Sequence, residues 1–401
     1  MKIAFVGNRY FNSSTPAAWS GLPFFMRRSL ERAGLKTVDC VLEEPFLWAP
    51  FAEYALRRLA GQRSLRGCHE QILKNYAAQL ARRLEILEVD AVFSPSSWLV
   101  AYLKTEIPVF FWTDACVASM LNFYESFSGL PASVVRAAHE AERSALTLCT
   151  GAFYASDWAA QTALHYYRPD PAKVHVVPFG GNLLEFPQAD EIARSIESRS
   201  TSRCELLLIG VDWKRKGVDR AIAATAGVLA RNRPARLTVV GCTPPRGTKL
   251  PDYVHVIPFI SKNTPEGGRQ LAEIYARSHF FIMPSRAEAY GLVFAEANAY
   301  GLPCLAPLVG GIPSIISNGI NGQLFSLQAD EDDYAKYIVE LMDNYPRYKV
   351  LASQSAGEAR NRLNWDCAGQ RVAGLLKASV DGKQNTRVLA PPTASPHHVT
   401  A

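Results

Sequence analysis

The sequence predicts an α/β protein built from two doubly wound domains, each with a parallel sheet. Short apolar runs, typical of buried strands, alternate with helix-forming segments from residue 2 onward. The alternation stops over the polar residues 182–203, which show little apolar periodicity, and then restarts at 205–211. Two such domains in succession leave a cleft between them, and in open parallel sheets ligands bind at the carboxyl ends of the strands.

In the first half, the predicted strands and helices follow one another as in a parallel sheet. Ser20 is a good N-cap residue and Pro23 suits a first helical turn, so we expect a helix there that ends near Gly34. The predicted strands are 2–7, 37–42, 90–94, 108–112, 148–155 and 174–178, and further helical patterns cover 131–146 and 157–167. We assign residues 1–185 to this domain.

The second half repeats this pattern. Strands are predicted at 205–211, 237–241, 254–257 and 279–283, and helices at 217–232, 268–278, 292–300, 331–343, 347–362 and 365–379. We assign residues 186–362 to the second domain and 363–380 to a closing helix. The last residues, 381–401, are rich in Pro, Thr, Ser and His, and we expect a disordered tail.

Composition limits the class of protein. The 401 residues are 48% hydrophobic and carry a net charge of +6, which favours anionic substrates or an anionic membrane surface as much as it favours a solvated basic surface. Eight cysteines are scattered without CxxC pairs, as expected in a reducing cytosolic compartment. No run is long enough for a signal peptide or a transmembrane helix. We expect no nucleic-acid partner.

One mostly helical stretch, residues 46–87, combines basic and apolar side chains. Its arginines are Arg57, Arg58, Arg63, Arg66, Arg82 and Arg83, and among them stand Phe51, Tyr54, Leu56, Leu59 and Leu65. Such a segment could make peripheral contact with an anionic membrane or bind an acidic acceptor. A helix with a solvated basic face explains the same residues equally well.

The segment 284–303 has the character of a binding loop. Pro284 ends an apolar strand, Gly291 allows a tight turn, and a helix-forming run follows. This places Glu288 in a loop and Glu296 about one turn into the helix. The backbone N–H groups of Tyr290, Gly291, Leu292 and Val293 would be free to bind a ligand at the start of that helix. Amides beside two carboxylates suit a ligand with phosphate and hydroxyl groups.

A second loop, 210–217, brings cations to the start of the second domain. It lies between a predicted strand and helix and contains Arg215 and Lys216. At the carboxyl end of a strand, these side chains could neutralise a diphosphate. A solvated basic turn is the alternative explanation.

Together these motifs resemble the retaining GT-B glycosyltransferases of family GT4. The matching patterns are Glu288-x7-Glu296 around Gly291, and Gly210-x4-Arg215-Lys216-Gly217. Further likeness comes from the segments 19–25, 176–182, 310–313 and 318–322. The resemblance implies a GT-B fold of two Rossmann-like domains facing each other, with a closing helix that packs back across the first domain.

The resemblance also implies roles for individual residues. Glu288 would bind hydroxyls of a donor sugar, and Glu296 the ribose of a nucleotide. Arg215 and Lys216 would neutralise the diphosphate leaving group, which the amide of Gly21 would approach from the first domain. The amides of Ala289, Tyr290 and Gly291 would hold sugar or phosphate oxygens. This chemistry needs neither a metal nor a cofactor beyond the donor.

Two positions depart from the family pattern. Val211 stands where many relatives carry an arginine, and Asp114 stands near the place of a first-domain histidine. Asp114 could orient a hydroxyl of the sugar or of the acceptor, or it could cap the segment that follows. Asp330-Glu-Asp332 has the letters of a metal-binding DxD motif, but its place at a predicted helix start favours capping.

The expected activity is therefore transfer of a hexose from a nucleotide-diphosphate sugar to an acceptor hydroxyl, with retention of configuration. The acceptor could be a glycan, a lipid-linked molecule or a small molecule. Two alternatives remain, a GT-B epimerase acting on a nucleotide sugar and a GT-B-shaped scaffold without turnover. The base, sugar and acceptor cannot be deduced from the sequence.

Overall fold

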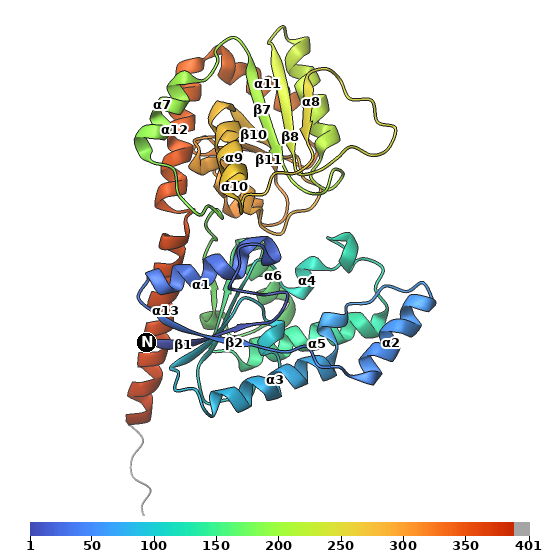
Figure 1. Ribbon diagram of the computed structural model, residues 1–401, viewed down its shortest axis with the longest axis vertical. Coiled ribbons are helices and arrows are strands. Elements are labelled where there is room, and N and C mark those ends of the chain that lie inside the picture. Colours follow the sequence, from blue (N-terminus) through green and yellow to red (C-terminus); the bar gives the residue numbers. More distant parts are fainter. Residues whose placement is uncertain (389–401) are drawn as a thin grey trace, which may run out of the picture.

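The computed structural model describes residues 1–388 and contains two parallel six-stranded sheets, placed one above the other along the long axis (Figure 1). The first sheet has the strand order β2-β1-β3-β4-β5-β6. Its strands are β1 (Lys2–Gly7), β2 (Lys36–Val41), β3 (Ala91–Ser94), β4 (Val109–Thr113), β5 (Gly151–Tyr154) and β6 (Val174–Val176). Each predicted strand of the first half is present within a few residues.

Helices cover both faces of this sheet, as a parallel sheet requires. They are α1 (Leu22–Arg32), α2 (Trp48–Leu59), α3 (Glu70–Leu84), α4 (Val117–Met120), α5 (Ala132–Leu148) and α6 (Asp157–Tyr167). The stretch predicted as mostly helical is divided, because residues 60–69 between α2 and α3 form turns and a short 3-10 segment.

The second sheet has the order β12-β11-β10-β7-β8-β9, with all its pairs parallel. Its strands are β7 (Cys204–Ile209), β8 (Ala235–Val240), β9 (Val254–Ile257), β10 (Phe280–Ile282), β11 (Cys304–Pro307) and β12 (Gly322–Phe325). Of these strands, β11 and β12 were not predicted from the sequence. Its helices are α8 (Val218–Ala230), α9 (Pro265–Arg277), α10 (Leu292–Ala299), α11 (Glu331–Asp343) and α12 (Tyr345–Asn361). Two parallel sheets with flanking helices agree with the predicted α/β fold class.

A helix that was not predicted lies in the polar stretch 182–203. This helix, α7 (Ala189–Ser198), buries Ile192 and Ile196, which are four residues apart and therefore share one face. Both side chains pack beside Gly301 of the second domain. Two isoleucines in ten residues gave too little periodicity for a prediction, but they are enough to attach the helix to the domain.

The last described helix, α13 (Trp365–Val388), crosses from the second domain to the first (Figure 1). It runs along α1, where Asp366 forms an ion pair with Arg32 at 3.0 Å. The helix continues to Val388, so its predicted end at residue 380 is wrong. No proline follows before Pro391 to interrupt it. The remainder of the expected tail lies outside the described residues.

Candidate functional site

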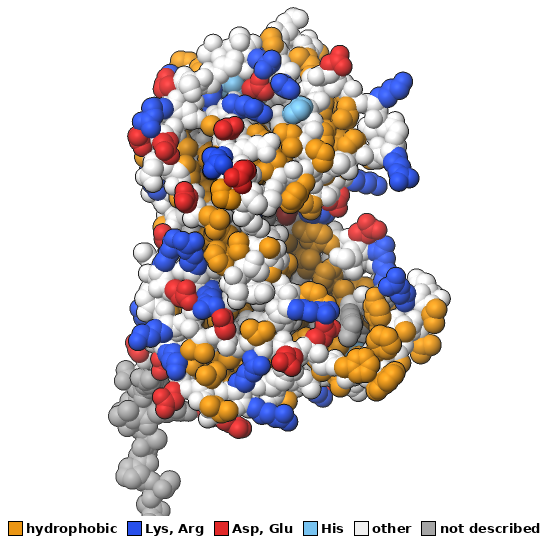
Figure 2. Space-filling model, in the orientation of Figure 1, with side chains coloured by type: hydrophobic (Ala, Val, Ile, Leu, Met, Phe, Trp, Pro, Cys, Tyr) orange, Lys and Arg blue, Asp and Glu red, His pale blue; other side chains and the backbone are white. Residues whose placement is uncertain are grey.

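A crevice of about 550 Å³ lies between the domains at the carboxyl ends of both sheets. Figure 2 shows the molecule hollowed between its two domains. The first domain contributes Asp114 and the loop before α1, and the second contributes the α10 start and the cationic loop. The predicted site residues that line the crevice are Asp114, Arg215, Lys216, Glu288, Tyr290, Gly291, Leu292, Val293 and Glu296. Residues far apart in the sequence thus share one cavity.

The N-terminus of α10 opens into this crevice. Its N-cap, Gly291, has φ 99°, and a Cβ there would lie 2.7 Å from the Phe294 ring and 3.2 Å from Glu288 Cγ. A side chain at this position would therefore be strained and crowded. The N–H groups of Leu292 and Val293 are in the first turn, where a helix has no internal acceptors for them. They are available to an anionic ligand.

The cationic loop is tied to Glu288 in this structure. Lys216 Nζ forms a buried ion pair with Glu288 Oε2, and Arg215 Nη1 lies 3.4 Å from the same oxygen. Arg215 also donates to the carbonyl of Ala287 at 3.1 Å. The two predicted groups, cations and carboxylate, therefore neutralise each other.

The amide of Ala289 is already engaged, contrary to the prediction that it would hold a ligand oxygen. It donates to the hydroxyl of Tyr124 at 2.8 Å, and Ala289 is not among the residues that line the crevice. Tyr124 belongs to the first domain, and its ring lies under the Arg215 guanidinium at 5.2 Å. Burial raises the pKa of this phenol, with a further rise from Glu288, so it stays neutral. No sequence motif marks Tyr124.

Glu296 also has a cationic partner that sequence reasoning missed. Its Oε1 lies 2.9 Å from Nζ of Lys262, which comes from the loop after β9. Glu296 is buried and Lys262 is partly exposed. The same loop lines the crevice with Phe259 and Ile260.

Asp114 lies in the crevice at the end of β4. Burial, together with the negative charge of Glu288, raises the pKa of its carboxyl to about 6, against the opposing effect of backbone hydrogen bonding. A carboxyl that titrates near neutral pH can exchange a proton with a ligand hydroxyl, so its position and its pKa allow a functional role.

The first-domain wall is a strained turn before α1. Trp19, Ser20 and Gly21 all have positive φ, at 41°, 57° and 84°. The N-cap of α1 is Gly21 rather than Ser20 as predicted, because Ser20 adopts this left-handed conformation and makes no cap hydrogen bond. Asn182 holds the turn by donating to the Ser20 carbonyl at 2.7 Å, and it accepts a 2.8 Å hydrogen bond from the Trp365 indole.

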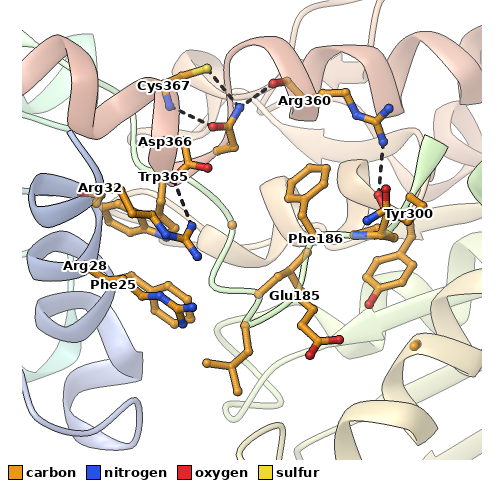
Figure 3. A pocket seen from close by; sticks show the side chains of 18 of the residues that line it. Phe25, Arg28, Arg32, Glu185, Phe186, Tyr300, Arg360, Trp365, Asp366 and Cys367 are labelled. Atoms are coloured by element: carbon orange, nitrogen blue, oxygen red, sulfur yellow. Dashed lines mark hydrogen bonds and ion pairs between the residues drawn. The ribbon is translucent and has the colours of Figure 1, made fainter. Parts of the chain in front are cut away.

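A larger cavity, of about 920 Å³, lies at the hinge rather than at the site (Figure 3). It is lined by Phe25 and Arg28 of α1, Glu185 of the linker, and Trp365 of α13, among others. It contains none of the predicted site residues.

The acidic triplet before α11 caps the helix, as expected. Asp330 accepts hydrogen bonds from the backbone N–H groups of Asp332 and Asp333 at 3.0 and 3.1 Å. Within residues 1–388, no group of three or more His, Cys, Asp or Glu side chains could hold a metal ion. No helix in the same range is long and apolar enough to cross a membrane.

The second domain matches a known family. Residues 203–344 fit the family model of glycosyl transferases group 1. D-inositol 3-phosphate glycosyltransferase of Actinosynnema mirum is 31% identical over 227 residues, which cover 53% of this chain and 53% of that protein. The enzyme of the same name from Segniliparus rotundus is 28% identical over 224 residues. The chain thus matches about half the length of these curated relatives.

Solved structures show the same fold over nearly the whole chain. Sucrose-phosphate synthase from Thermosynechococcus elongatus superposes with a TM-score of 0.68 at 17% identity, over 95% of this chain and 100% of that one. Anabaena HepE in complex with UDP-glucose superposes with a TM-score of 0.62 at 15% identity, over 94% and 100%. WaaG, a glycosyltransferase involved in lipopolysaccharide biosynthesis, gives 0.60 at 17% identity, over 93% and 99%. The fold is that of the GT-B glycosyltransferases.

Proposed function

We propose that this protein is a glycosyltransferase that moves a hexose from a nucleotide-diphosphate sugar to an acceptor hydroxyl. The observation that carries the proposal is the crevice itself. It brings the first turn of α10, two cations and two buried carboxylates into one cavity between the domains. The cations and the first turn of α10 would bind phosphate, and the two carboxylates would bind the hydroxyls of the sugar and of the ribose. The match of residues 203–344 to glycosyl transferases group 1 supports the same conclusion.

The chemistry follows from the charges in the crevice. When the bond between sugar and diphosphate breaks, negative charge develops on the departing phosphate oxygen. We infer that Arg215, Lys216 and the N–H groups of Leu292 and Val293 stabilise it, and that no metal is needed. Once a diphosphate pairs with Lys216, Glu288 is released to accept hydrogen bonds from the sugar. Glu296 would bind the ribose, and the turn at Gly21 would approach the diphosphate from the first domain.

We further propose that the transfer retains anomeric configuration, as the family likeness implies. Asp114 is placed to orient an acceptor or donor hydroxyl. The name of the Actinosynnema mirum relative supports an acceptor that carries a negative charge, and the UDP-glucose bound to HepE supports a UDP-hexose as donor. Both assignments are open to a direct experiment.

The test is the release of nucleoside diphosphate from a panel of UDP-, GDP- and ADP-hexoses, with and without candidate acceptors. We expect release from one donor class, and an NMR spectrum of the product in which donor and product anomers agree. A product of the opposite anomer would overturn retention. An epimerised nucleotide sugar would instead favour the epimerase. No turnover of any donor would favour the scaffold.

A further inference from the structure

Helix α2 contacts the rest of its domain partly through polar side chains. Glu53 accepts a hydrogen bond from His69, with Oε2 and Nε2 3.2 Å apart, and Arg57 donates to Ser133 of α5 at 2.9 Å. Glu53 and Arg57 also pair with each other, while the Glu53 side chain stays 45% exposed. A surface helix of a globular protein ordinarily packs an apolar face against the core.

The outward face of α2 is an apolar stripe. Trp48, Phe51, Ala52, Ala55 and Leu56 stand at positions i, i+3, i+4, i+7 and i+8, the spacing of one helical face, and Leu59 extends it by a turn. Trp48 is 74% exposed and Leu59 is 85% exposed. Phe46, just before the helix, stacks edge-on against Trp48 at 5.3 Å and is also exposed. We call Phe46, Trp48, Phe51, Leu56 and Leu59 the α2 stripe.

The stripe forms one patch at the end of the first domain. Figure 2 shows hydrophobic side chains gathered where Figure 1 places α2, far from the hinge. Exposed apolar patches of this kind mark binding surfaces. Tryptophan and phenylalanine beside arginine are typical of helices that lie in the interface of a bilayer. Arg58 is exposed on the edge of the helix, next to the stripe.

The same edge of α2 leads to the candidate site. Tyr54 and Arg58 line a groove of about 700 Å³ that continues past Tyr124 to Arg215. Arg63, on its rim, pairs with Glu125 at 3.1 Å. A molecule anchored beside the stripe could therefore extend its polar end along this groove into the crevice.

We propose that the α2 stripe docks into the surface of an anionic lipid bilayer, and that the groove receives the polar head of an acceptor held in that bilayer. The second part rests on the proposed glycosyltransferase function, whereas the first does not. A second copy of the chain is a weaker occupant. A 12-residue helix is about 18 Å long and about 10 Å wide. The area of its outer face is therefore well below the roughly 800 Å² that each partner of a stable complex buries.

The test is flotation of the full chain with vesicles of phosphatidylcholine alone or mixed with phosphatidylglycerol. The stripe is disrupted by the double substitution Trp48→Ser and Leu59→Ser. The matched control, Leu327→Ser with Val350→Ser, removes two exposed apolar side chains from the second domain. We expect the wild type and the control to float with anionic vesicles, and the stripe variant to lose at least about tenfold in partitioning, since two large apolar side chains no longer enter the bilayer.

Arg58→Glu is expected to reduce the preference for anionic over neutral vesicles by severalfold, because it reverses a charge at the stripe. Donor turnover with no vesicle present separates the two proposals. The stripe variant should keep it, and a wild type that turns over donor but does not float would overturn the bilayer proposal alone. Equal flotation of the stripe variant and wild type would also overturn it. A dimer that the stripe substitutions dissociate would replace the bilayer with a second copy.

Discussion

Glu288 is the residue on which the charges of the crevice depend. It is held by Lys216 and Arg215 while its carboxylate is buried, and an unpaired buried carboxylate would be costly. A diphosphate offers the two cations an alternative partner of higher charge. On the proposed function, ligand binding would exchange one ion pair for another rather than create a new charge in a buried place. This exchange would account for one carboxylate and two cations in adjacent positions.

Lys216→Ala should lower donor turnover by about 10²- to 10³-fold, because removing one preorganised charge from a developing anion typically costs that much. The fold should remain, since Arg215 still faces Glu288. Lys214→Ala, which removes an exposed lysine two residues away, is the control and should behave like the wild type. Steady-state kinetics of diphosphate release measure both. Near-normal turnover in Lys216→Ala would refute the diphosphate assignment.

Asp114→Asn should change stability in a pH-dependent way. Because the pKa of Asp114 rises from its ordinary 3.8 to about 6, the folded chain binds more protons than the unfolded chain between these values. The unfolding free energy contributed by Asp114 therefore falls as pH rises through this window. Asparagine does not titrate, so the unfolding free energy of Asp114→Asn does not fall in this way as pH rises.

The Tm of Asp114→Asn minus the Tm of the wild type should be more positive at pH 8 than at pH 4. Asp252→Asn, an exposed aspartate, serves as the control and should show little difference at either pH. Differential scanning fluorimetry is sufficient for the comparison. A Tm difference that does not vary with pH would show that the buried carboxyl is not the cause. If Asp114 also contacts substrate, Asp114→Asn should have a lower kcat/KM than the wild type even at pH 8, where its relative Tm is higher.

At the scale of elements, the crevice is defined by helix starts. The first turn of α10 faces it directly, and the turn before α1 approaches from the other domain. Both helices begin at a glycine with positive φ, which lets the backbone reverse sharply and leaves the first N–H groups uncovered. On the proposed function, these amides act together with Arg215 and Lys216 on a phosphate.

Gly291→Ala should destabilise the protein by about 1–3 kcal/mol, from left-handed strain, and should also weaken donor binding as the Glu288 loop is displaced. Gly357→Ala in α12 is the matched control, since no atom lies within 4 Å of its new Cβ. There alanine should be neutral or stabilising by about 0.5–1 kcal/mol. Urea denaturation gives both values. Equal stability of the two variants would contradict the strained turn.

The sequence predicted the strands and helices around the site well, because buried strands and glycine-bounded helices are local signals. It also identified Arg215, Lys216, Glu288 and Glu296, which stand in recognisable spacings. It missed Tyr124 and Lys262. Their roles come from tertiary contacts with Ala289 and Glu296, and no local pattern encodes a contact between segments 34 or 165 residues apart. The prediction of a free Ala289 amide failed for the same reason.

At the scale of the whole molecule, the two domains are joined by an aromatic cluster. Trp365 begins α13 and is buried against Phe25, Trp112 and Phe179, with ring centroids 5.5–6.1 Å apart. Its indole also binds Asn182, which holds the turn of the first-domain site wall. The hinge and one wall of the crevice are therefore mechanically connected.

Trp365→Ala should cost about 3–5 kcal/mol of stability, the usual range for a buried tryptophan. It should also weaken donor affinity, because Asn182 loses its partner. Trp48→Ala, at an exposed tryptophan, provides the control and should leave the unfolding midpoint unchanged. Chemical denaturation followed by circular dichroism measures this. A Trp365→Ala protein as stable as Trp48→Ala would show that the cluster does not join the domains.

The central claim, that the crevice binds a nucleotide sugar, is tested most directly by thermal shift with UDP-, GDP- and ADP-hexoses. One class should stabilise the wild type by about 2.7 kcal/mol at a hundred times its dissociation constant, a shift of several degrees in Tm. Glu296→Gln should show a much smaller shift at the same concentration, because the charged partner of the ribose is lost. A wild-type Tm that no nucleotide sugar moves, or an equal shift in Glu296→Gln, would contradict the account.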